Sequence, residues 1–266
     1  MVAFSGVVSY PLIVSGHVYV TVANASGSGT RLFALNASTG ATIWGPVELG
    51  GSYNWSSLAY DAGRVFTVNG SGVMEAFNAT TGALDWATQL QLQYSFTSPL
   101  TAAGGYVYTA GAGEGGTVYA VRETNGELVW SRSVENGDNS SPAVSASGVY
   151  VSYACGQTYD FGPTTGALIW HRNTDCEGGG GLTPVLAGNR LYVRDDTFPA
   201  VLNAATGSLL APFSASGPAP AVDSSNVYDL SGETLTASSL SSGSDIWSFT
   251  GDRTLTSAPV VAGATV

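Results

Sequence analysis

Four carboxylates fall in loop-like segments, where they could perform acid–base chemistry: Glu114, Asp138, Glu177 and Asp195. Hydrolysis of a glycosidic bond needs two such groups about 5–9 Å apart. Aromatic and amide side chains accompany them, a combination that suits a sugar, a peptide or a cation. The competing interpretation is that these are ordinary solvated loops. The full set of candidate ligand-binding residues is Tyr53, Asn54, Trp55, Tyr94, Glu114, Asp138, Asn139, Glu177, Arg194 and Asp195.

Composition excludes several other functions. The chain has 8 Arg and Lys residues together, against 19 Asp and Glu, for a net charge of -11. It therefore lacks the clustered cations that nucleic acids or anionic membranes attract. No Gly-x-Ser-x-Gly sequence marks an acyl-transfer nucleophile. His17 and His171 are interpreted as strand-surface residues, so we expect no catalytic residue and no metal site.

The first thirty residues contain no Asp, Glu, Lys or Arg. A signal peptide would begin with a basic region, which is missing here. A membrane-spanning helix would need about 20 apolar residues in a row, and serine, glycine, proline and histidine interrupt this segment. We expect neither a signal peptide nor membrane insertion within this chain.

The strongest pattern is a repeat of about forty residues. A Thr-Gly or similar pair recurs six times, and a tryptophan follows four residues after the glycine in every copy except one, where Ala211 stands. The glycines are Gly40, Gly82, Gly126, Gly166, Gly207 and Gly243, and the tryptophans are Trp44, Trp86, Trp130, Trp170 and Trp247. We interpret this tryptophan as a core residue between repeat units, because its large ring and single donor suit a half-polar slot.

Each unit predicts four short strands. The first follows a small residue and proline, the second is an aromatic run such as residues 149–151, the third precedes Thr-Gly, and the fourth runs into the tryptophan. In residues 36–40, Asn36 is expected to form an Asx-turn and Gly40 to supply a positive φ. No segment keeps a helical apolar period. The sequence therefore predicts an all-β fold, a β-propeller of four-stranded antiparallel blades.

Residues 34–44 and 76–86 resemble the tryptophan-docking repeat of quinoprotein-type propellers, with Asn36 and Asn78 in place of the usual Asp. That family includes pyrroloquinoline quinone (PQQ) dehydrogenases, BamB-type outer-membrane assembly lipoproteins and many secreted or surface bacterial propellers of unknown role. Resemblance to the dehydrogenases implies eight blades, a calcium ion held by Glu, Asn and Asp, an Asp base and often a disulfide of adjacent cysteines. The chain has no adjacent cysteines, and no matching motif places the calcium ligands.

Six units are complete, and a seventh begins at residues 257–261. We therefore expect residues 1–266 to form a single propeller domain that is incomplete at its C-terminal end and comes from a parent of seven or eight blades. An open propeller leaves a sheet edge exposed, which favours association.

The strand order sorts the loops onto two faces. Connections from the fourth strand to the next unit share one face with the loops between second and third strands, and this face holds the candidate ligand-binding residues. Cys155 and Cys176, the only cysteines, fall on it in the fourth unit. We expect a disulfide between them, worth roughly 3 kcal/mol, which indicates an oxidising, extracytoplasmic compartment. A metal site is less favoured because His171 is the only histidine nearby.

These observations favour a non-catalytic, extracytoplasmic propeller that acts as a scaffold or binding module for a protein or glycan, with no cofactor. Two alternatives stay open. One is a fragment or relative of a PQQ-dependent dehydrogenase, which would use PQQ and calcium. The other is a carbohydrate-binding or carbohydrate-cleaving propeller, which would use the loop carboxylates.

Overall fold

The computed structural model of the protein describes residues 6–24, 29–49, 58–174, 176, 180–194, 198–213, 218–252, 255, 257–262 and 265–266. These residues form strands and turns without a helix, so this part of the chain has no helix able to span a membrane. The strands make six antiparallel sheets, which we call blades one to six in chain order.

The blades follow the predicted repeat units. Blade one contains β1 (Gly6–Val8), β2 (Leu12–Val14), β3 (His17–Asn24), β4 (Thr30–Asn36) and β5 (Thr42–Leu49). Blade two contains β6 (Ala59–Asp61), β7 (Arg64–Val68), β8 (Val73–Asn78) and β9 (Leu84–Gln89). Blade three contains β10 (Thr101–Ala103), β11 (Tyr106–Gly113), β12 (Gly115–Arg122) and β13 (Leu128–Val134).

The second half of the chain repeats the same order. Blade four contains β14 (Ala143–Val144), β15 (Val149–Tyr153), β16 (Gln157–Phe161) and β17 (Leu168–Arg172). Blade five contains β18 (Val185–Ala187), β19 (Arg190–Val193), β20 (Ala200–Asn203) and β21 (Leu209–Pro212). Blade six contains β22 (Ala221–Val222), β23 (Asn226–Ser231), β24 (Thr234–Ser239) and β25 (Asp245–Thr250).

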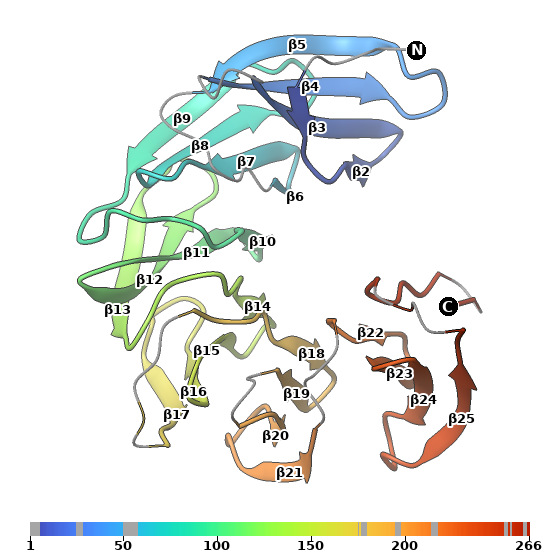
Figure 1. Ribbon diagram of the computed structural model, residues 1–266. Helices are drawn as coiled ribbons and strands as arrows, with labels where there is room; N and C mark the ends of the chain where they lie inside the picture. The colour runs from blue at the N-terminus through green and yellow to red at the C-terminus, as the bar shows by residue number, and fades with distance from the viewer. Residues whose placement is uncertain are drawn as a thin grey trace.

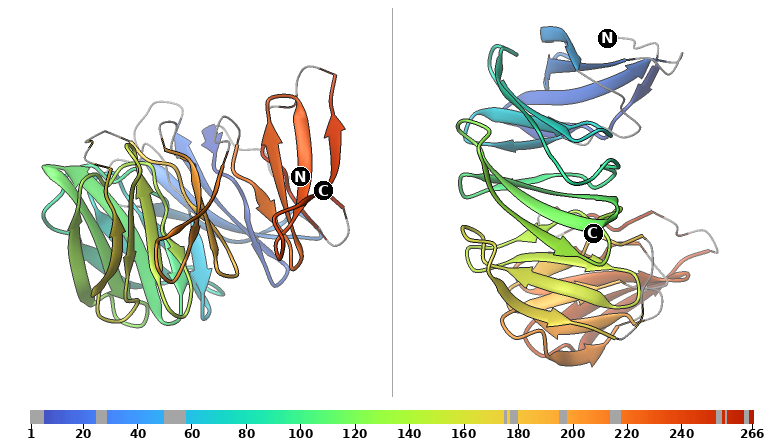
Figure 2. Two further views of the ribbon diagram at one scale, coloured as in Figure 1. Left: turned by 90° about the horizontal axis from the view of Figure 1, so that it is seen from below. Right: turned by 90° about the vertical axis from the view of Figure 1, so that its left-hand side faces the viewer.

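The blades follow one another along an arc, with the short first strands on its inner side and the last strands on its outer side (Figure 1). Contacts link β2 to β6, β6 to β10, β10 to β14 and β14 to β18. Seen from the side, the sheets stand next to one another in one layer, with turns at its two faces (Figure 2). This arrangement confirms the predicted propeller. After β25, the described residues form one isolated bridge, between Ala262 and Thr265.

The turn between the third and fourth strands has the predicted chemistry. Asn36 Oδ1 accepts hydrogen bonds from the backbone N–H groups of Ser38 and Thr39, both at 2.9 Å. The N–H of Gly40 donates to the Asn36 carbonyl at 2.8 Å, and Gly40 has a φ of 69°. Asn side chains bond to their own turn in this way, and glycine takes the positive φ at little cost.

Four tryptophans join the first five blades, each one linking its blade to the blade that follows. The indole Nε1–H of each donates to a backbone carbonyl in the following blade's turn, and the four pairs are Trp44 with Ala79, Trp86 with Glu123, Trp130 with Pro163 and Trp170 with Ala204, at 2.8–2.9 Å. The ring also covers the glycine of that turn: a Cβ added to Gly82 would lie 2.7 Å from the Trp44 ring. The predicted inter-blade role is confirmed for these four residues.

Apolar clusters lie between successive sheets. Phe66 and Met74 of blade two pack with Val107 and Tyr119 of blade three, and equivalent clusters occur at the joints from blade one through blade six. Trp247 departs from the predicted role, because its side chain is 41% exposed. The reason is that no described sheet packs on its side of blade six.

Candidate functional site

The predicted ligand-binding residues divide into two groups. Tyr94, Glu114, Asp138, Asn139 and Arg194 are described and lie in the connections expected for the loop face. The other five lie outside the described residues: Tyr53, Asn54, Trp55, Glu177 and Asp195. A ligand-binding role for either group stays a prediction.

The loop between β9 and β10 is fastened to the hairpin formed by β11 and β12. Gln93 Nε2 donates to Thr117 Oγ1 at 3.0 Å, and Gln93 Oε1 accepts from the N–H of Glu114 at 3.2 Å. Ser95 and Ala112 exchange two backbone hydrogen bonds, at 3.0 and 2.8 Å. These hydrogen bonds hold the backbone of the β9–β10 loop against the β11–β12 hairpin.

This fastened loop presents two apolar side chains to solvent, Leu92 at 73% and Tyr94 at 70% exposure. The Tyr94 ring lies over Gly113, where an added Cβ would come within 2.5 Å of it. Leu92 has a φ of 79°, a conformation that costs a non-glycine residue about 1–2 kcal/mol. A strained backbone held by its surroundings often marks a functional segment.

Asp138 and Asn139 connect two loops. The Thr97 hydroxyl donates to Asp138 Oδ1 at 3.3 Å and accepts from the N–H of Asn139 at 3.2 Å. The Ser98 hydroxyl donates to the Gly137 carbonyl at 2.8 Å. These contacts join the β9–β10 loop to the connection between β13 and β14. The structure thus gives Asp138 a positioning role, holding neighbouring loops together.

The predicted disulfide between Cys155 and Cys176 is present, with a Cα–Cα distance of 5.4 Å. Beside it, Gln157 connects the returning chain: its Nε2 donates to the Cys176 carbonyl and to Asn173 Oδ1, both at 2.9 Å. Gln157 Oε1 lies 2.7 Å from His171 Nε2. Burial lowers the pKa of His171, while the charge of Glu135 opposes this effect. The disulfide and the hydrogen bonds of Gln157 thus cross-link this end of blade four, which we call the cap.

Arg194 follows β19 and is 9% exposed. It acts electrostatically on Asp229 of β23, so it relates blade five to blade six. Burial raises the pKa of Asp229 to about 6, and the Arg194 charge opposes that rise. Burial likewise lowers the pKa of Arg194, against the effect of Asp229. The buried Arg194 guanidinium and the partly buried Asp229 carboxyl thus lie within electrostatic range of each other at this joint.

Two strongly perturbed carboxyls were not among the predicted site residues. Glu123, 2% exposed, lies in the turn between β12 and β13; burial, followed by the charge of Asp61, raises its pKa to about 7. Burial also raises the pKa of Asp160, on β16, to about 7. The sequence did contain a signal for Glu123. In the first two units the corresponding turn position holds alanine, so an acidic residue there departs from the repeat.

Neither carboxyl belongs to a metal centre in the described structure. Within those residues, no group of three or more His, Cys, Asp or Glu side chains comes together in a way that could hold a metal ion. The loop face offers instead an exposed apolar pair on a hydrogen-bonded frame. Such a surface is suited to contact with another macromolecule, since aromatic and apolar side chains on a rigid frame bind with little loss of entropy.

Two curated proteins align with part of this chain. A 174-residue stretch is 30% identical to tetrathionate hydrolase of Acidithiobacillus ferrooxidans, covering 59% of this chain and 33% of that protein. A 183-residue stretch is 28% identical to outer membrane protein assembly factor BamB of Yersinia pestis, covering 65% of this chain and 41% of BamB. The chain therefore spans less than half the length of either relative.

The solved structure of BamB from Moraxella catarrhalis has the same fold, with a TM-score of 0.70 at 20% identity over 96% of this chain and 79% of that one. The family model described as outer membrane protein assembly factor BamB matches residues 2–157 and 154–266. These two matches together extend across all six blades, and the chain therefore belongs to the BamB-like family of PQQ-type β-propellers.

Proposed function

We propose that the protein is a non-catalytic scaffold that works outside the cytoplasm and binds a protein of the bacterial envelope. The family match over residues 2–157 and 154–266 supports this proposal most directly. The name of that family refers to assembly of outer membrane proteins, a role that requires binding other polypeptides. The Cys155–Cys176 disulfide also supports it, because such bonds persist in oxidising compartments.

The proposed contact surface is the β9–β10 loop with Leu92 and Tyr94 at its centre. Both side chains are largely exposed, and hydrogen bonds from Gln93 and Ser95 hold the backbone in place. An ordered loop loses little backbone entropy on binding, so less of the free energy gained by burying these two side chains is offset by ordering the loop.

Photo-crosslinking tests the proposal in the native host. A photoreactive phenylalanine analogue replaces Tyr94 in one variant and Thr81, in an exposed turn on the opposite face, in the control. The expected result is a cross-link from position 94, and not from position 81, to a protein that mass spectrometry identifies as an outer membrane component or assembly factor. Equal cross-linking from both positions, or none from position 94, would contradict the proposed surface.

A binding measurement with the identified partner makes the test quantitative. Tyr94→Ala is expected to weaken binding about 10–30-fold, the loss typical of an aromatic residue central to an interface. Tyr10→Ala is the matched control, because Tyr10 is also an exposed tyrosine, at 95%, and lies in blade one. The control should bind as the unaltered protein does.

Location and catalysis need separate measurements. Alkylation of thiols in intact cells before lysis should leave Cys155 and Cys176 unmodified, whereas two alkylated cysteines would contradict an oxidising compartment.

For catalysis, the protein is mixed with PQQ and calcium and assayed for dye reduction with alcohols and sugars. Turnover above background would overturn the non-catalytic assignment.

A further inference from the structure

A cavity of about 630 Å³ opens between blades five and six, on the face opposite the β9–β10 loop. Three turns form its walls: residues 187–190 between β18 and β19, residues 223–226 between β22 and β23, and residues 239–241 at the end of β24. Most of these residues carry polar side chains, and Ala187 and Leu240 are the apolar ones. Polar groups need hydrogen-bond partners once a ligand covers them, so this lining favours a polar ligand.

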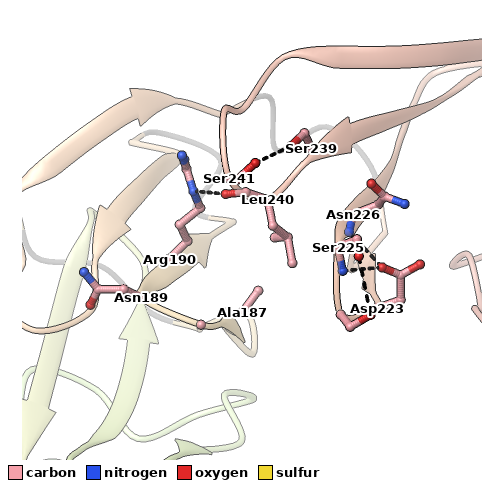
Figure 3. Close-up of a pocket in the computed structure, with 11 residues that line it drawn as sticks. Ala187, Asn189, Arg190, Asp223, Ser225, Asn226, Ser239, Leu240 and Ser241 are labelled. Atoms are coloured by element: carbon pink, nitrogen blue, oxygen red, sulfur yellow. Dashed lines mark hydrogen bonds between the residues drawn. The ribbon is translucent and has the colours of Figure 1, made fainter.

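Arg190 lies in the wall of this cavity with its guanidinium only partly used. Its Nε donates to the Leu240 carbonyl at 2.8 Å, which holds the side chain along one side of the space between the blades (Figure 3). Within the described part of the chain, its two Nη groups make no hydrogen bond and no ion pair. The end of the guanidinium therefore presents two parallel N–H donors that lack an acceptor.

Other arginines have their partners within the protein. Arg122 pairs with Glu127 at 2.9 Å. Arg132 donates through its Nη1 and Nη2 atoms to two backbone carbonyls, at 2.7 and 2.9 Å. The free Nη donors of Arg190 are thus a local feature of the cavity.

Asp223 is the carboxylate of the cavity wall, and its own turn occupies it. Asp223 Oδ1 accepts hydrogen bonds from the N–H groups of Ser225 and Asn226, both at 2.7 Å, and Oδ2 accepts from the Tyr228 hydroxyl at 2.8 Å. These hydrogen bonds, that from Ser225 first, keep the pKa of Asp223 below its usual range. Figure 3 shows Asp223 on the other side of the space from Arg190. It is therefore not the partner of the guanidinium.

We propose that this cavity binds a small organic carboxylate with hydroxyl groups, whose carboxylate accepts the two free donors of Arg190. Arginine binds carboxylates in this bidentate way, and such charge-assisted hydrogen bonds are about twice as strong as neutral ones. The net charge of -11 repels anions from the protein as a whole, so an anion that binds needs a local cation of this kind.

The size and the remaining polar groups of the cavity set the class of ligand. Its volume of about 630 Å³ lies within the range of small-molecule sites, about 300–1,000 Å³, and exceeds what a carboxylate group alone would fill. Ser224 and Ser241 lie in its walls, and their hydroxyls can donate to or accept from hydroxyl groups of the ligand. A hydroxylated carboxylate uses both the cation and these serines.

Gluconate serves as the probe, and NMR on the intact protein follows the arginine Nε–H signals during a titration. The expected result is saturable binding with a Kd of about 1 mM, together with a shift of the Arg190 signal. Glucose, which has the hydroxyls without the carboxylate, should cause no shift. Sulfate tests for an adventitious ion only: sulfate binding as tight as that of gluconate would overturn the proposal, because the site would then not recognise an organic carboxylate.

Arg190→Gln keeps a donor for the Leu240 carbonyl but removes the cation, and should weaken gluconate binding at least about tenfold. Arg122→Gln is the matched control, because it removes the same charge from a surface pair in blade three, and it should bind gluconate as the unaltered protein does. Unchanged binding in folded Arg190→Gln would overturn the proposal. If that variant does not fold, the Arg190 signal of the unaltered protein decides, and its failure to shift at the highest gluconate concentration overturns it. None of these results depends on the β9–β10 loop.

Discussion

At the scale of single residues, the repeated tryptophan does two jobs at each joint. Trp86 is 8% exposed, and its Nε1–H satisfies the Glu123 carbonyl at 2.8 Å. Removing the ring would leave a void between two sheets and a turn carbonyl without its donor, and both changes cost free energy. Trp247 makes a ring contact with Tyr228 within its own blade and remains largely exposed.

We therefore expect Trp86→Ala to lower the free energy of unfolding by about 3–5 kcal/mol, and Trp247→Ala by about 1 kcal/mol or less. Urea denaturation followed by circular dichroism measures both. Losses of equal size would show that position in the array does not matter, and would contradict the joint described for Trp86.

At the scale of elements, the turn between third and fourth strands must contain glycine for two separable reasons. Gly40 and Gly82 both have a positive φ, of 69° and 73°. An added Cβ at Gly40 has nothing within 4 Å, whereas one at Gly82 would lie 2.7 Å from the Trp44 ring. Comparison of these two positions separates backbone strain from crowding under the ring.

Gly40→Ala should cost about 1 kcal/mol, the strain of alanine at positive φ. Gly82→Ala should cost about 2 kcal/mol more, because the Trp44 ring has to move. Chemical denaturation of the two variants, under one set of conditions, checks the difference. Equal costs would mean that the ring shifts freely, against the packing seen here.

The cap on blade four is a second element whose stability can be tested. The Cys155–Cys176 bond spans a sequence separation of 21 residues, and closure of a loop of that size is worth about 3 kcal/mol in the chain-entropy account. The double variant Cys155→Ser/Cys176→Ser should unfold at lower denaturant than the oxidised protein and match the reduced protein. Identical midpoints for all three samples would show that the bond contributes nothing.

At the scale of the whole molecule, buried carboxyls make stability depend on pH. Burial raises the pKa of Glu123 and Asp160 to about 7 and of Asp229 to about 6. In the unfolded chain these groups titrate near their ordinary values, about 4. The folded state therefore holds protons more tightly, and their stabilisation is complete below about pH 4 and is lost as the pH rises through 6 and 7.

The protein is accordingly expected to be more stable at pH 5 than at pH 8. Glu123→Gln mimics the protonated carboxyl beside Asp61 and should reduce that difference by about 2 kcal/mol. Glu127→Gln is the control: Glu127 pairs with Arg122 at 2.9 Å at the surface, and Arg122 lowers its pKa, so its titration falls below this range. Thermal melts from pH 5 to 8 would contradict the account if both variants behaved alike.

Much of the fold follows from the sequence because each signal is local. The spacing from Gly82 to Trp86, and the Asn36 to Gly40 turn, depend on backbone conformation within a few residues. Repetition of these signals predicts a series of blades. One blade cannot bury its apolar residues alone, so neighbouring blades have to stack. The Cys155–Cys176 pairing was predicted in the same way, since strand order places both residues on one face.

Tertiary structure decided what depends on neighbouring blades. The sequence marks Ala211 as an exception, but only the packed joint shows that Arg190 crosses to the Leu240 carbonyl and that a cavity opens beside Arg190. Likewise, the amino-acid sequence alone does not predict that Glu123 is buried beside Asp61, or that Leu92 is exposed on a loop held by hydrogen bonds. The conformation of a turn depends on a few neighbouring residues, so it recurs wherever the sequence pattern recurs. The burial of a side chain, its pKa and the volume of a cavity depend instead on contacts between side chains that are about forty or more residues apart in the sequence.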